Sequence, residues 1–134
     1  METFLHLSLP VTVLDAALAF YVDTLGCTLG RVRLEQGFAD VWFYGMQLTL
    51  QEQPRHVLPA DEQGARHFGA ALPPEELEAV LARLDRSTVT WLERPTVDTD
   101  GRLNGKTSAK VADPSGNVIE LKSYPGGRAD IDAE

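Results

Sequence analysis

The sequence contains a single cysteine, Cys27, so no disulfide can form within the chain. Small secreted domains usually compensate for a small core with several disulfides, and this absence excludes that class. A reduced, cytoplasmic setting is therefore expected. The chain of 134 residues is long enough to bury about two-thirds of its unfolded surface in one core without a covalent staple.

Long apolar runs are also missing. No stretch reaches the roughly 18 consecutive apolar residues that a membrane-spanning helix requires. Residues 1–3 place no basic segment ahead of an apolar one, as an export signal would. Neither a membrane protein nor an exported one is expected.

Basic residues are scarce. Twelve Lys and Arg against 20 Asp and Glu give a formal net charge of −8. The arginines are scattered along the chain, so no basic stripe offsets the repulsion between this charge and a phosphate backbone. Nucleic-acid binding is not expected.

The sequence does contain an internal repeat. His6 and His67 each stand in the middle of a short strand-like run, at residues 5–9 and 66–70. Each run is followed by apolar residues at helical spacing and then by three strand candidates. The apolar positions of the predicted helices run from Leu14 to Leu25 and from Leu77 to Leu84, and residues 73–76 form the first turn of the second helix. The further strands are predicted at 28–35, 38–44 and 46–52 in the first copy and at 88–93, 107–112 and 117–123 in the second.

Local signals support these boundaries. Thr12 and Asp15 predict the N-terminal cap of the first helix, and Gly26 predicts its left-handed end. Residues 113–116 (Asp-Pro-Ser-Gly) predict a type I turn.

The predicted organisation is a single α+β domain, 1–134. It divides into module one (3–52), a polar linker (53–64), module two (65–124) and a fraying tail (126–134), with a long polar loop at 94–106.

Strand parity places four polar side chains away from the aliphatic faces: His6, Gln47, His67 and Glu120. If the eight strands form a curled mixed sheet, a cup with the helices outside, these groups line its interior. Two imidazoles and one carboxylate are the ligand set of an open divalent-metal site, and their facial arrangement favours Fe(II), with Mn, Ni, Co and Zn as alternatives.

The repeated βαβββ unit resembles the vicinal oxygen chelate superfamily, which includes glyoxalase I, type I extradiol dioxygenases, and fosfomycin or bleomycin resistance proteins. The resemblance extends from about Phe4 to Tyr124, and its most specific segments are Leu18–Gly26 and Asp113–Leu121. It implies that His6, His67 and Glu120 are the metal ligands. Gln47 falls on the fourth ligand position, as a direct ligand or as a neighbour of the ligands.

Further residues are predicted around this centre. The substrate pocket is expected to include Arg31, Arg33, Trp42 and Ser108. Lys110 and His56 join Glu120 as candidate catalytic groups. The large extradiol enzymes resemble one another in carrying a further histidine upstream of the second histidine, and here His56 is the one residue that can stand in for it.

Three functions remain open from the sequence. The preferred one is an extradiol-dioxygenase-like oxygenase, whose substrate chelates the metal through two adjacent oxygens. A glyoxalase I-like lyase or isomerase is the alternative, and a small-molecule binding protein of the bleomycin-resistance kind is the third. A homodimer is expected, because an open cup of this size leaves strand edges to be covered.

Overall fold

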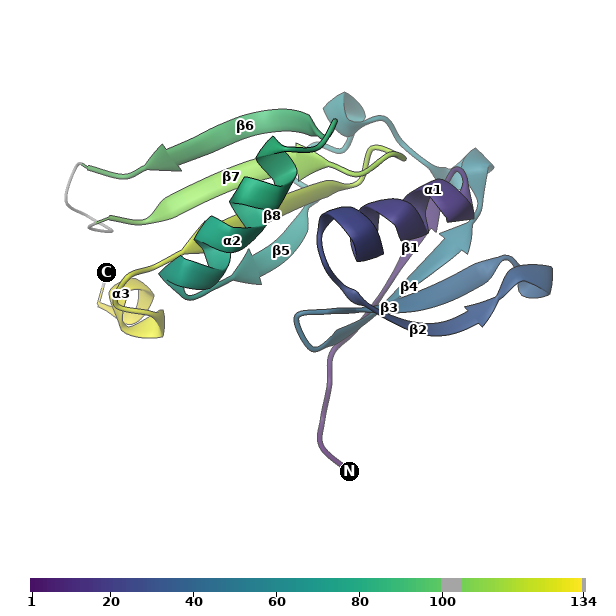
Figure 1. The fold of residues 1–134 in the computed structure, drawn as a ribbon, viewed down its shortest axis with the longest axis horizontal. Coiled ribbons are helices and arrows are strands. Elements are labelled where there is room, and N and C mark those ends of the chain that lie inside the picture. Colours follow the sequence, from purple (N-terminus) through teal and green to yellow (C-terminus); the bar gives the residue numbers. More distant parts are fainter. Residues whose placement is uncertain (100–104, 134) are drawn as a thin grey trace. The chain divides into compact units, whose positions relative to one another are not determined.

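The computed structural model describes residues 1–99 and 105–133. In these residues eight strands form two four-stranded sheets, which confirms the α+β class and the two modules (Figure 1). The chain divides into two compact units. Unit 1 contains residues 1–64 together with 113–117, and unit 2 contains residues 65–112 and 118–134.

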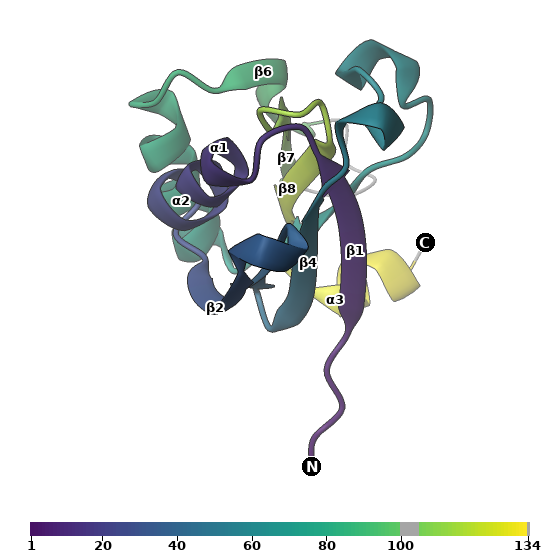
Figure 2. The same ribbon diagram turned by 90° about the vertical axis from the view of Figure 1, so that its right-hand side faces the viewer.

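Unit 1 has a mixed sheet in the order β1-β4-β3-β2. Its strands are β1 (His6–Val11), β2 (Thr28–Arg33), β3 (Phe38–Phe43) and β4 (Met46–Glu52). β1 runs parallel to β4, and the other pairs are antiparallel. Val41, Leu48 and Leu50 point to the buried face, and helix α1 (Leu14–Leu18) lies beside the sheet (Figure 2).

The start of α1 differs from the prediction. Val13, not Thr12, holds the N-cap position, and no side chain caps the helix from there. Glu52 of β4 instead accepts the Leu14 amide at 2.8 Å, while the Thr12 amide donates to Ser115 Oγ at 2.8 Å. Side chains distant in sequence therefore accept the backbone amides at the start of α1, in place of a capping side chain next to the helix. The helix continues as a wider π-helical segment, η1 (Ala19–Thr24), and Gly26 follows with the predicted positive φ of 85°.

Unit 2 repeats the plan with the sheet order β5-β8-β7-β6. Its strands are β5 (Phe68–Ala71), β6 (Thr90–Val97), β7 (Thr107–Ala112) and β8 (Val118–Ser123). Helix α2 (Pro74–Asp85) crosses one face of this sheet and buries Leu77, Val80 and Leu84 (Figure 1). The opposite face is left for polar side chains.

Several connections depart from the prediction. β6 runs to Val97 and so takes up the start of the loop expected at 94–106, of which residues 100–104 lie outside the described part. The linker contains two 3₁₀ turns, η3 (Pro54–His56) and η4 (Ala60–Glu62). The tail expected to fray carries a short helix, α3 (Arg128–Asp132), whose Asp130 accepts the Gly126 amide at 2.8 Å.

The turn between β7 and β8 packs within unit 1. Asp113 is 4% exposed and accepts four hydrogen bonds: from the Ser115 and Asn117 amides, the Asn117 side chain and the Tyr21 hydroxyl, at 2.7–2.9 Å. The predicted turn is present, with Gly116 at φ 96° and its amide donating to the Asp113 carbonyl. No helix in the described residues is long and apolar enough to cross a membrane.

Candidate metal centre

His67 and Glu120 line one cavity of about 220 Å³ in unit 2. Glu120 lies in β8, and His67 immediately precedes β5 rather than standing inside a strand as predicted. His67 Nε2 is 3.9 Å from Glu120 Oε1. Two atoms bound to one transition-metal ion at about 2.1 Å can be at most about 4.2 Å apart, so the two atoms lie within the distance that one ion can bridge.

The orientation of His67 suits a ligand. Its Nδ1 lies 2.9 Å from the Ala65 carbonyl oxygen, which can only accept a hydrogen bond. In the neutral imidazole Nδ1 therefore carries the proton, and Nε2, the atom nearer Glu120, keeps its lone pair. Metal-binding histidines are typically held in this way through the ring nitrogen that does not bind the ion.

His6 in unit 1 has the same arrangement. It is the first residue of β1, and its Nδ1 lies 3.1 Å from the Gln47 carbonyl oxygen. The neutral ring again presents a bare Nε2. The β1–β4 register pairs His6 with Gln47, so the predicted ligand and the predicted fourth position are neighbours on one sheet face.

A buried carboxylate stands beside Gln47 on this face. Asp40 is 4% exposed and accepts hydrogen bonds from Thr49 Oγ1 at 2.6 Å and Arg31 Nε at 2.8 Å. Burial alone would raise the pKa of Asp40, but these bonds, the Arg31 charge and a bond from the Gln47 side chain outweigh it and lower the pKa. Arg31, predicted in the substrate pocket, is thus committed to Asp40.

Lys122 is a site residue that the sequence analysis did not assign. Its Nζ lies 3.3 Å from Glu120 Oε1, and its side chain lines the same cavity as His67. Burial alone would lower the pKa of Lys122, but hydrogen bonding to Tyr124 and the Glu120 charge outweigh it and raise the pKa. Strand parity was the available signal, because Lys122 follows Glu120 by two residues on the same face.

The other predicted residues are distributed between the units. In unit 2, Lys110 and Ser108 of β7 are the register partners of Glu120 and Lys122, and Lys110 pairs with Glu93 at 3.5 Å. In unit 1, Trp42 is the register partner of Gln47 and is 37% exposed. Arg33 donates to its neighbour's carbonyl, that of Val32, and is exposed.

His56 is the last residue of η3 in the linker portion of unit 1 and is exposed.

In the part of the chain that the structure describes, no three His, Cys, Asp or Glu side chains are gathered closely enough to hold a metal ion. His6 belongs to unit 1, whereas His67 and Glu120 belong to unit 2. The complete triad accordingly stays a prediction.

Comparison with known proteins gives a match over most of the chain. The family model of the Glyoxalase/Bleomycin resistance protein/Dioxygenase superfamily matches residues 3–121. A search of curated proteins found no match.

Solved structures share the fold at low sequence identity. A glyoxalase/bleomycin resistance protein/dioxygenase from Alicyclobacillus acidocaldarius is similar with a TM-score of 0.80 and 24% identity, covering 92% of each chain. A fosfomycin resistance protein from Listeria monocytogenes is similar with a TM-score of 0.73 and 15% sequence identity, and the match covers 92% of this chain and 93% of that protein. A lactoylglutathione lyase from Agrobacterium tumefaciens is similar with a TM-score of 0.63 and 22% sequence identity, and the match covers 92% of this chain and 94% of that protein.

Proposed function

The chain belongs to the Glyoxalase/Bleomycin resistance protein/Dioxygenase superfamily, and we propose that it is a metal-dependent enzyme with extradiol-dioxygenase-like activity. The proposed ligands are His6, His67 and Glu120. One observation carries the proposal: both histidines are held through Nδ1 by a backbone carbonyl and present a bare Nε2, and one of them faces a carboxylate at 3.9 Å.

The donor set favours an open site. Two imidazoles and one carboxylate leave about three of six octahedral positions for other ligands. When bound, an Fe(II) ion would supply Lewis acidity toward a substrate that chelates it and redox activity toward dioxygen. Gln47 offers only a neutral amide, so it serves as a weak ligand or as a hydrogen-bonding neighbour.

The protein's own residues would bind and orient the substrate. The Lys122 ammonium lines the cavity beside Glu120 and can pair with a negatively charged oxygen of a catecholate or a similar anion. A lysine is charged at neutral pH, and the raised pKa of Lys122 strengthens this preference. The substrate class is therefore a small anion with two adjacent oxygens.

A glyoxalase-like lyase or isomerase is the second candidate, and the Glu120–Lys122 pair favours it. Glu120 can accept a proton from a carbon next to a carbonyl, while the lysine stabilises the negative charge that develops on the oxygen. With Gln47 at the fourth position, Glu120 is the one carboxylate among the four proposed groups. The same residues thus permit proton transfer without dioxygen.

Metal analysis is the direct test. Protein purified without chelators and reconstituted anaerobically with Fe(II) should bind one iron ion for each set of ligands. The variants His6→Ala, His67→Ala and Glu120→Gln should each lose this iron. His56→Ala is the matched control and should retain the metal. Wild-type metal content in His67→Ala would refute the proposed ligand set.

Activity assays separate the two reactions. Iron-loaded protein should consume oxygen with a catechol and form a coloured ring-cleavage product, and Gln47→Ala should keep much of this activity. Turnover of a methylglyoxal–thiol adduct without oxygen, increased by Gln47→Glu with Ni(II), Co(II) or Zn(II), would instead establish the lyase. Inactivity in both assays without bound metal would indicate a binding protein.

A further inference from the structure

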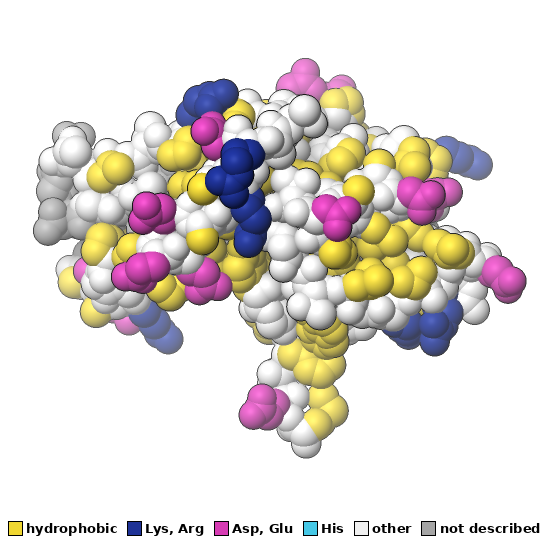
Figure 3. All heavy atoms as spheres, in the orientation of Figure 1, with side chains coloured by type: hydrophobic (Ala, Val, Ile, Leu, Met, Phe, Trp, Pro, Cys, Tyr) yellow, Lys and Arg dark blue, Asp and Glu magenta, His cyan; other side chains and the backbone are white. Residues whose placement is uncertain are grey.

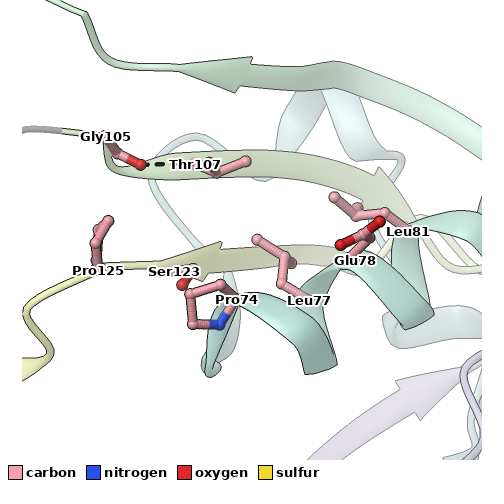
Figure 4. A pocket seen from close by; sticks show the side chains of 8 residues that line it. All are labelled: Pro74, Leu77, Glu78, Leu81, Gly105, Thr107, Ser123 and Pro125. Atoms are coloured by element: carbon pink, nitrogen blue, oxygen red, sulfur yellow. Dashed lines mark hydrogen bonds between the residues drawn. The ribbon is translucent and has the colours of Figure 1, made fainter.

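A second cavity lies in unit 2 on the opposite side of the sheet from His67 and Glu120. It has a volume of about 300 Å³ and opens between α2 and the ends of β7 and β8 (Figure 4). Ser123 lines it from β8, and the alternation of side chains along a strand directs Ser123 and Glu120 to opposite faces. The cavity is therefore separate from the proposed metal centre.

The composition of the sheet changes at this cavity. Beneath α2 the paired residues of β7 and β8 are aliphatic: Val111 with Ile119, and Ala109 with Leu121. The next pair on the same face is Thr107 with Ser123. Two hydroxyl groups thus stand where continued packing against the helix would favour apolar side chains.

The Ser123 hydroxyl has no partner within the part of the chain that the structure describes. Ser123 is 3% exposed, and its Oγ has no hydrogen-bond partner among the described residues. The Thr107 hydroxyl, in contrast, donates to the Gly105 carbonyl at 3.4 Å (Figure 4). A buried polar group without a partner is unfavourable, and a bound molecule in the adjoining cavity is one way to supply the missing hydrogen bond.

The remaining walls restrict what this molecule can be. Pro74, Leu77, Leu81 and Pro125 make them largely apolar. Among the described residues that line the cavity, Glu78 is the one with an ionisable side chain. Glu75 and Glu76 lie in the first turn of the same helix, outside the lining. An anion is therefore disfavoured, whereas a neutral molecule meets an apolar surface and one hydrogen-bonding group.

We propose that this cavity is a second binding site, for a small neutral molecule with an apolar ring or chain and one hydroxyl or carbonyl group that bonds to Ser123. Its volume corresponds to about ten water molecules at ~30 Å³ each. A single substituted ring has a suitable size. Binding requires neither the metal nor the residues of the proposed centre.

The test is a titration of the ¹⁵N-labelled full chain with cyclohexanol, followed by NMR. Saturable shifts are expected at the amides of Leu77, Thr107 and Ser123. Ser123→Ala should weaken binding by about three- to tenfold, since one neutral hydrogen bond is lost. Cyclohexanecarboxylate should bind more weakly than cyclohexanol, and Glu78→Gln should reduce that difference.

Two tryptophan variants locate the binding. Leu81→Trp fills the cavity and should abolish the shifts, whereas Leu58→Trp, at an exposed leucine of the linker, should leave them intact. No saturable shift in the wild type would overturn the proposal. Equal affinity in Ser123→Ala, or undiminished binding in Leu81→Trp, would do the same.

Discussion

Lys122 lies closer to the Glu120 carboxylate than His67 does, at 3.3 Å against 3.9 Å. If it pairs with a substrate anion, Lys122→Met should raise KM for 4-nitrocatechol about tenfold, corresponding to one charge-assisted hydrogen bond. Iron content should be unchanged, because Lys122 has no free electron pair in its charged form.

Lys106→Met is the matched control for this lysine. Lys106 is also a lysine of unit 2 and also contacts Tyr124, at 5.5 Å from its ring, but it does not contact Glu120 in the described structure. Its variant should keep the wild-type KM. An equal rise of KM in both variants would mean that general charge, and not the Lys122 position, attracts the substrate.

Asp40 should make stability depend on pH. Its pKa is lowered in the folded state, so its carboxylate stabilises the fold at any pH above the ordinary value of 3.8, and this contribution disappears as the pH falls through the folded pKa. Asp40→Asn should lower the free energy of unfolding by about 1–3 kcal/mol at pH 7. The difference from wild type should shrink below about pH 4.

Urea denaturation at pH 7 and pH 3 measures this difference. Asp61→Asn, in the exposed η4 turn, is the control and should match wild type at both values. A stability difference between wild type and Asp40→Asn that is constant from pH 7 to pH 3 would show that the Asp40 charge does not contribute.

At the scale of elements, Gly69 determines how closely β5 approaches β8. It is the register partner of Glu120, and a Cβ at this position would overlap the Glu120 backbone. Gly69→Val should therefore separate the strands and displace the Glu120 carboxylate. We expect a loss of about 1–3 kcal/mol of stability together with reduced iron binding.

Ala71→Val provides the comparison for Gly69→Val. Ala71 lies on the same face of β5 as Gly69, is exposed and already carries a Cβ beside β8. Its melting temperature and iron content should remain near those of the wild type. A Gly69→Val variant that is equally unaffected would show that β5 tolerates a wider spacing.

The elements differ in how far their sequences determine them. The strands β3, β4, β7 and β8 could be predicted within about a residue, because alternation and flanking glycines or turns are local signals. The cap of α1 could not, since Glu52, distant in sequence, accepts the Leu14 amide. The parity of β8 identified Glu120, yet the ion pair with Lys122 depends on side-chain conformation, which alternation does not specify.

The same limit applies to the turn at 113–117. Its Asp-Pro-Ser-Gly composition predicted the turn, but the bond from the Tyr21 hydroxyl to Asp113 joins residues 92 positions apart. Such a partner follows from the packing of unit 1 and not from the turn itself. The repetition of βαβββ was visible in the sequence, and the assignment of this turn to unit 1 was not.

At the scale of the whole molecule, unit 1 presents an apolar surface that suits a partner. Figure 3 shows hydrophobic side chains gathered over α1 and the neighbouring strands of unit 1. Leu29 of the edge strand β2 is 48% exposed, and Leu34, directly after β2, is 66% exposed. Exposed apolar groups beside an unpaired strand edge favour association with another protein surface.

We therefore expect a homodimer with a mass of twice 14.7 kDa by light scattering at micromolar concentration. Leu34→Glu should weaken the dimer at least about tenfold, since a charge would have to be buried in an apolar contact. Leu58→Glu introduces the same charge at an exposed leucine of the linker and should leave the mass unchanged. A wild-type mass of 14.7 kDa at every concentration would refute the dimer, and a Leu34→Glu variant that dimerises normally would place the interface on another face.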